Sequence, residues 1–244
     1  MKISKLFFIG LITMNLIIVT TSCSSNDDNT VTPKTTELNE EEAVELIESS
    51  LRKSTAGFND TSKTFSESLT ADITINEDCS VIYNDTYVVN YEESIVQASY
   101  TVDWSYEMTC NSIGIPQSVT FSSSTDGNYS TQHIISNDYS TSNFDIIGLQ
   151  PSSETMVLNG DYVRNGMQEL NVVNTRSVTS ILTVTLTDIV IDKSTSNITS
   201  GTASLTLTGT SQNTNFSFEG SLIFNGDETA TLTINENTYV INIG

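Results

Sequence analysis

The chain has 244 residues and a formal net charge of −21, from 30 acidic and only nine basic residues. Such an acidic surface repels phosphate backbones and anionic membrane faces, so the composition excludes a nucleic-acid-binding role. The sequence contains no P-loop and no dinucleotide fingerprint, and we expect neither a cofactor nor a metal site.

The start of the chain is laid out like a secretory signal. Lys2 and Lys5 precede an apolar run at residues 6–19, which is followed by a TTS tripeptide and then Cys23. This run is shorter than the roughly 20 residues that a membrane-spanning helix needs. We therefore expect residues 1–22 to be removed and Cys23 to carry a lipid that anchors the protein to a membrane. An uncleaved N-terminal anchor helix is the alternative.

Residues 23–36 are rich in Ser, Asn, Asp and Thr and contain almost no apolar side chain. They cannot bury enough surface to fold, so they are predicted to form a flexible acidic tether. No Pro/Gly-rich linker divides the rest of the chain. Residues 37–244 are accordingly predicted to form one domain, which combines a helix with an all-β region.

The first element of this domain is a predicted amphipathic helix. Asn39 suits the N-cap position and Glu42 completes a capping box, while Gly57 is a suitable stop. Apolar residues then fall on one stripe, which needs a hydrophobic surface to cover. The stripe consists of Ala43, Val44, Leu46, Ile47 and Leu51. Residues 59–71 fit either a second short helix or a loop.

From residue 72 onward the hydrophobic period changes to two, which is typical of strands with one buried face. The clearest strand covers residues 100–110, where apolar side chains alternate with polar ones. We expect ten or eleven strands, separated by turn signals. These signals are Asp126-Gly127, Gly148 with Pro151, Asn165-Gly166, Ser200-Gly201, Asn225-Gly226 and Asn235-Glu236-Asn237.

Short turns between successive strands favour an antiparallel meander, and the alternation implies one wet face and one covered face. The predicted fold is therefore mainly β. It is a curved antiparallel meander sheet, a partly open barrel, with the N-terminal amphipathic helix packed on its concave face. A two-sheet β-sandwich is the alternative.

Several short segments carry a family resemblance. They are EEEAVELIESSLRKSTAGF at residues 40–58, the pair Cys79 and Cys110, and the ending TYVINIG, together with the acidic SSNDD that follows Cys23. With these segments the chain resembles an uncharacterised family of Bacteroidetes, especially flavobacterial, surface lipoproteins. The resemblance implies an outer-membrane location with exposure at the cell surface, and it implies no particular activity.

Cys79 and Cys110 are the two cysteines that remain once Cys23 is lipidated. An even number of cysteines in an oxidising compartment favours a disulfide. Closing a loop of about 32 residues stabilises a domain by roughly 3–4 kcal/mol. A metal pair or a reactive thiol is the alternative, although no CxxC motif or His-rich tract supports a metal site.

His133, the single histidine, is the first candidate for catalysis. It follows Tyr129 and Thr131 and precedes Ile135 in an alternating segment, which places it on the side of apolar neighbours. A histidine base needs a nucleophile and an orienting acid, and the chain has no G-x-S-x-G motif. A structural or surface role is the better interpretation.

Two pairs of carboxylates, Glu92-Glu93 and Asp188 with Asp192, resemble the acid pairs of glycosidases. With 30 acidic residues in the chain, such pairs arise easily by chance. The turn at residues 192–197 offers oxygen ligands for Ca²⁺ but lacks the pattern of a calcium loop, so a plain hairpin loop is preferred.

An aromatic-rich region is the last candidate for a binding site. It contains Tyr83, Tyr87, Tyr91, Tyr100, Trp104 and Tyr106. Aromatic residues at period two belong more often to a core, and stacking on sugars is the alternative.

The sequence thus favours a non-catalytic surface lipoprotein that acts as a binding or envelope-structural module. Its expected partners are the membrane, through the lipid on Cys23, and a protein or glycan that the sequence does not identify. One alternative is a carrier that holds an apolar ligand in a half-barrel cavity under the helix. A hydrolase acting on surface glycan or peptide is another.

Overall fold

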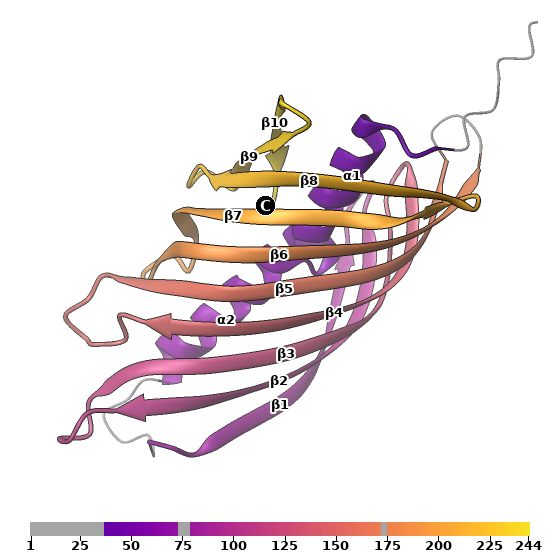
Figure 1. Cartoon of the computed structure of the whole chain (residues 1–244). Helices are drawn as coiled ribbons and strands as arrows, with labels where there is room; N and C mark the ends of the chain where they lie inside the picture. The colour runs from indigo at the N-terminus through magenta and orange to yellow at the C-terminus, as the bar shows by residue number, and fades with distance from the viewer. Residues whose placement is uncertain (1–36, 73–78, 172–174) are drawn as a thin grey trace, which may run out of the picture. The chain divides into compact units, whose positions relative to one another are not determined.

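The computed structural model describes residues 37–72, 79–171 and 175–244. The predicted signal at residues 1–22, the lipidated Cys23 and the tether at residues 23–36 lie outside these residues and stay predictions. The described part consists mainly of one antiparallel sheet that curls around two helices (Figure 1).

Ten strands form the sheet, each paired with the next along the chain. They are β1 (Ile82–Glu92), β2 (Gln97–Cys110), β3 (Pro116–Ser130), β4 (Ile134–Ile147), β5 (Thr155–Leu170), β6 (Arg176–Asp192), β7 (Ile198–Ser211), β8 (Thr214–Phe224), β9 (Thr229–Ile234) and β10 (Asn237–Asn242). The predicted curved meander is therefore confirmed. Because the described strands form a single sheet, with β1 and β10 at its open edges, the alternative of a two-sheet sandwich is wrong.

Helix α1 (Glu40–Leu51) begins as predicted. The Asn39 side chain accepts a hydrogen bond from the Glu42 amide at 2.9 Å, and the Glu42 carboxylate accepts one from the Asn39 amide at 3.1 Å. The helix ends earlier than Gly57, because a 3₁₀ turn, η1 (Lys53–Thr55), intervenes. The ambiguous region that follows is a helix, α2 (Phe58–Asp72).

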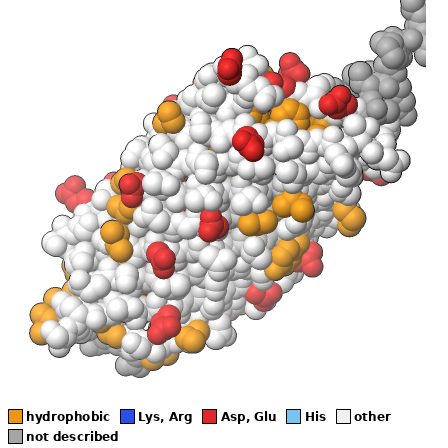
Figure 2. Space-filling view, in the orientation of Figure 1, with side chains coloured by type: hydrophobic (Ala, Val, Ile, Leu, Met, Phe, Trp, Pro, Cys, Tyr) orange, Lys and Arg blue, Asp and Glu red, His pale blue; other side chains and the backbone are white. Residues whose placement is uncertain are grey.

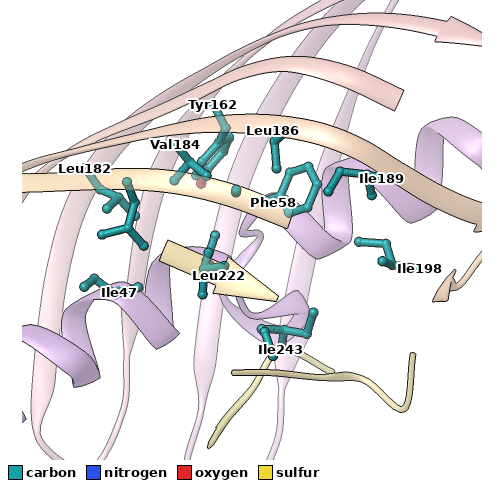
Figure 3. Packing of buried hydrophobic residues seen from close by; sticks show 14 of the residues in the cluster. Ile47, Phe58, Tyr162, Leu182, Val184, Leu186, Ile189, Ile198, Leu222 and Ile243 are labelled. Atoms are coloured by element: carbon teal, nitrogen blue, oxygen red, sulfur yellow. The ribbon is translucent and has the colours of Figure 1, made fainter. Parts of the chain in front are cut away.

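Both helices lie on the concave face of the sheet, and their apolar side chains join those of the strands in one core (Figures 1 and 3). Ile47 and Leu51 are fully buried, whereas Val44 is half-buried against the cluster. Phe58 lies with its ring centroid 5.8–6.1 Å from three sheet aromatics, namely Phe144, Tyr162 and Phe224. The concave face is thus covered by packed helices, one more than the sequence clearly predicted.

The helices are also hydrogen-bonded to both edges of the open sheet. At the β1 edge, the Tyr91 hydroxyl donates to the Asp60 carboxylate of α2 at 2.5 Å. At the β10 edge, the Tyr239 hydroxyl donates to the Glu40 carboxylate of α1 at 2.6 Å, and this bond is the main cause that lowers the pKa of Glu40. Contacts at both edges favour a permanent cover over a hinged one.

The disulfide between Cys79 and Cys110 is confirmed, with 5.7 Å between the two Cα atoms. It attaches the segment that enters β1 to the end of β2. A bridge that closes this loop restricts the unfolded chain and supports the first hairpin of the sheet.

The predicted turns are only partly correct. Turns do occur at Gly148 with Pro151, at Asn225-Gly226 and at Asn235-Glu236. Ser200-Gly201, however, lies inside β7, opposite a bulge at Asp188 of β6. Gly201 has a φ of 138°, which only glycine adopts without strain, so it serves the bulge instead of a turn.

Candidate functional site

Arg164 lies at the centre of a buried ionic cluster on the concave side of the sheet. Its guanidinium from β5 is 3.0 Å from the Asp138 carboxylate of β4 and 2.7 Å from the Tyr100 hydroxyl of β2. Tyr100 in turn donates to Asp138 at 2.9 Å. The guanidinium also donates to three backbone carbonyls near the end of α1 and in η1, those of Ser49, Ser50 and Thr55. Arg164 thereby fastens the helical segment to the middle of the sheet.

The surroundings of the cluster shift the pKa values of Tyr100 and Arg164 upward. Burial is the main cause that raises the pKa of Tyr100 far above its usual range, and the Arg164 charge only partly opposes it. For Arg164, burial alone lowers the pKa, but Asp138 and the surrounding tyrosines outweigh burial and hold the pKa well above its ordinary value. Tyr100 therefore stays a donor and Arg164 a cation, which suits a structural clamp better than proton transfer.

A second buried ion pair joins Arg176, the first residue of β6, to Glu42 in the first turn of α1. Arg176 also donates to the Glu37 carbonyl at 2.9 Å. Arg164 and Arg176 are the only basic residues in the ten described strands. All the positive charge of these strands therefore serves to attach the helices.

The opposite, convex face of the sheet is rich in Ser, Thr and Asn, and it carries acidic but no basic strand residues. Figure 2 shows this face with scattered acidic side chains and no visible Lys or Arg. The outward, exposed acids of the central strands are Asp103, Glu107, Asp126, Asp145, Asp161, Glu169 and Glu219. Unneutralised negative charge on this face favours neutral or cationic partners over anionic ones.

A hollow of about 460 Å³ opens on the convex face above the second half of β3, the first half of β4 and the second half of β5. Its rim has two rows of cross-strand neighbours, Asp126, Tyr139 and Asn165 in one row and Asn128, Asn137 and Met167 in the next. The backbone of Gly127, Asp138 and Gly166 forms the floor between the rows. We call this feature the β3–β5 hollow.

Two of the predicted turns, Asp126-Gly127 and Asn165-Gly166, lie in this hollow and are wrong, because both dipeptides sit inside long strands. A Cβ on Gly127 would lie 2.1 Å from the Ser99 carbonyl oxygen and 2.6 Å from the Tyr100 ring. A Cβ on Gly166 would lie 1.8 Å from the amide nitrogen of Gln168. The glycines therefore make room for side chains around the buried cluster, and this packing overrides their local turn preference.

His133 lies in the turn between β3 and β4. The predicted shared face is wrong, because Tyr129 is buried while Ile135 is exposed: the hairpin reverses the direction of the chain between them. The His133 ring lies 3.0 Å from a carboxylate oxygen of Glu45 in α1. This contact joins a turn to a helix, in agreement with the surface or structural interpretation.

The predicted acid pairs lie at a strand end, a bulge and a hairpin turn, and not in a catalytic cleft. Glu92 and Glu93 are exposed where β1 ends, and Asp188 sits at the bulge of β6. Asp192 accepts hydrogen bonds from Ser194 and Thr195, which lower its pKa. The Asp192 carboxylate thus shapes the hairpin turn.

The same turn is a poor calcium site. The side-chain oxygen of Asn197 accepts a hydrogen bond from the Lys63 ammonium at 2.8 Å, so a cation already occupies that position. Within the described ranges, no three His, Cys, Asp or Glu side chains are grouped so that they could hold a metal ion. The preferred interpretation as a hairpin loop agrees with this geometry.

The predicted aromatic region faces the concave side and belongs to the core. Phe65 of α2 packs at 6.0 Å between ring centroids from both Trp104 and Tyr106, and Tyr83 stacks on Tyr106 at 5.0 Å. The exposed aromatic residue of the hollow, Tyr139, was not among the predicted ones. One feature of the sequence could have indicated this site: Asn and Asp, which are disfavoured in strands, occupy outward strand positions around Tyr139.

Known proteins give no guide to this site. No family model, no curated protein and no solved structure matches the chain. Among residues 37–72, 79–171 and 175–244, none of the helices is long and apolar enough to cross a membrane. The functional interpretation therefore depends on the geometry of the two faces of the sheet.

Proposed function

We propose that this chain is a non-catalytic binding or envelope-structural module, held on the outer membrane by a lipid on Cys23, which presents the convex face of its sheet to a partner. The anchor part of the proposal comes from the order of charged, apolar and small residues before Cys23. The binding part comes from the contrast between the two faces of the sheet.

The observation that carries the proposal is that the helices close the concave face. Arg164 of β5 binds η1, and Arg176 of β6 binds α1. Tyr91 and Tyr239 bind the helices at the two edges of the sheet. Opening the concave side would mean separating α1 and η1 from Arg164 and Arg176, and separating buried charged groups from their partners is costly. The packed core thus supports a binding module over a carrier with a movable lid.

The convex face has the complementary properties. It is broad, polar, rich in hydroxyl and amide groups, and contains the β3–β5 hollow with exposed Tyr139 and Met167. Polar surfaces with a few exposed aromatic or thioether side chains are typical of recognition surfaces. This face is accordingly the proposed contact surface.

Labelling in whole cells tests the anchor, and a binding assay on isolated envelopes tests the contact surface. Cells that lack the chain are supplied with the full chain, with Cys23→Ala, or with Thr183→Arg, which places a cation at an exposed position of β6 on the convex face. We expect fatty-acid labelling and the lipid anchor to be lost in Cys23→Ala. Binding by the convex face is measured separately, with purified unlipidated chains on isolated envelopes. Thr183→Arg is expected to reduce this binding several-fold, because a long charged side chain obstructs the contact surface.

Thr70→Arg is the matched control, because Thr70 is an exposed residue of α2 on the helical side. It should bind envelopes like the unsubstituted chain. Fatty-acid labelling that persists in Cys23→Ala would contradict the anchor. Equal binding by Thr183→Arg and the unsubstituted chain, or a larger loss in Thr70→Arg, would contradict the assignment of the contact surface.

A further inference from the structure

We infer that the β3–β5 hollow is a subsite for a neutral saccharide. This inference rests on the proposed function and goes beyond it by naming the ligand class and the residues that recognise it. The residues that carry it are exposed side chains that make no contact needed for the packing of the described sheet.

Three asparagines and one aspartate surround the hollow on the exposed side of three adjacent strands. Asn128 pairs with Asn137 across β3 and β4, while Asp126 and Asn165 flank Tyr139 in the neighbouring row. Within the described residues, none of these four polar side chains has a hydrogen-bond partner. Asn and Asp are disfavoured in strands, so placing four of them together lowers the β-propensity of these strands. No stabilising contact of their side chains with the described residues offsets this loss.

The hollow also offers apolar contact surface. Tyr139 is 44% exposed and Met167 is 66% exposed, and the two lie diagonally across β4 and β5. A ring with a polar tip suits ligands that are apolar on one face and hydroxylated at the edge, as sugar rings are. Exposed amides beside it supply both donors and acceptors for hydroxyl groups.

Charge narrows the ligand class. Asp126 is the charged residue at the rim, and the outward side chains of the described strands include no Lys or Arg. Uronic acids, sulfated sugars and phosphorylated glycans would therefore meet repulsion without a compensating cation. A neutral sugar meets no such penalty, and its hydroxyl groups can donate to the Asp126 carboxylate.

Size and surroundings agree with a short stretch of an oligosaccharide. The volume of about 460 Å³ lies within the range of roughly 300–1,000 Å³ that is usual for small-ligand sites. A second hollow of about 360 Å³ lies at the preceding positions of β3, where it is lined by the small side chains of Ser122 and Ser124. Neighbouring hollows along one strand suit several linked sugars better than one.

The test measures binding of the mature chain to cellotriose, maltotriose, mannotriose and laminaritriose, with trigalacturonic acid as the anionic probe, by titration calorimetry and by NMR of the asparagine side-chain amides. We expect at least one neutral trisaccharide to bind at millimolar concentrations and to shift the amides of Asn128, Asn137 and Asn165. Asn137→Ala and Tyr139→Ala are each expected to weaken binding about tenfold, the effect of one lost hydrogen bond or stacking contact.

Asn215→Ala is the matched control, because Asn215 is an exposed asparagine of β8, three strands away from β5 and outside both hollows. It should leave the affinity unchanged, and circular dichroism should show all three variants folded. Absence of binding by every neutral probe, stronger binding of trigalacturonic acid, or equal weakening by Asn215→Ala would each overturn the inference. If Thr183→Arg still reduces envelope binding several-fold in that case, the proposed function stands and only the ligand class is wrong.

Discussion

Replacing Arg164 with methionine is expected to lower the free energy of unfolding by about 3–5 kcal/mol, the usual cost of removing one partner from a buried ion pair. The substitution leaves the Asp138 carboxylate buried without its cation. It also removes the donor for the Thr55 carbonyl, which Arg164 reaches at 2.9 Å. Urea unfolding followed by circular dichroism measures the change.

Two controls show whether the loss comes from the clamp. Arg52→Met removes a half-buried i,i+4 pair with Glu48 and should cost at most about 1 kcal/mol. The double variant Arg164→Met/Asp138→Ala should lose less than the sum of its single variants, because the second change removes the stranded charge. Stability within 1 kcal/mol of the unsubstituted chain for Arg164→Met would refute the clamp.

The second large effect is expected for Ile47→Ala, which should cost about 2–5 kcal/mol through lost burial and a residual cavity. Ile47 is 0% exposed in α1 and belongs to the core shared by helices and sheet. If α1 is a permanent cover, the loss appears in full and the native protein takes up no hydrophobic dye. A movable lid would give a smaller loss together with dye binding at a newly opened pocket.

Ile181→Ala is the matched control, because Ile181 is 47% exposed on the convex face. It should change the free energy of unfolding by no more than about 0.5 kcal/mol. Unchanged stability of Ile47→Ala, combined with new dye binding, would promote an apolar-ligand carrier over the binding module proposed here.

Local signals in the sequence were sufficient for most of the fold. The Asn39–Glu42 capping box marked the start of α1, because the two side chains satisfy amides that every helix start leaves free. Strict alternation marked the strands, since only one of their faces is buried. Cysteine parity was sufficient for the bridge between Cys79 and Cys110.

Features that depend on contacts between distant segments were not predictable in this way. The stop of α1 at Leu51 depends on η1, which Arg164 holds from a strand far along the chain. Asp126-Gly127 has the chemistry of a turn, but the Tyr100 ring on the next strand needs the space above Gly127. No local pattern shows where such a ring will lie.

The candidate site was missed for a related reason. The clearest aromatic pattern in the sequence, at period two, lies on the concave side, where Trp104 and Tyr106 belong to the core. Tyr139 lies in an outward position of β4, and a single aromatic residue among serines and asparagines forms no pattern that predicts a binding site. Only the strand register brings it beside Asn165 and Asp126.

Oxidation of Met167 tests the central claim, that the convex face is the contact surface. Of the methionines in the described residues, Met167 is 66% exposed, whereas Met108 and Met156 are buried and serve as internal references. The chain is treated with limiting peroxide, either free or bound to isolated envelopes, and sulfoxide is measured by mass spectrometry. We expect binding to slow the oxidation of Met167 several-fold and to leave the slow oxidation of Met108 and Met156 unchanged. Equal oxidation of Met167 in the free and the bound chain would contradict the central claim.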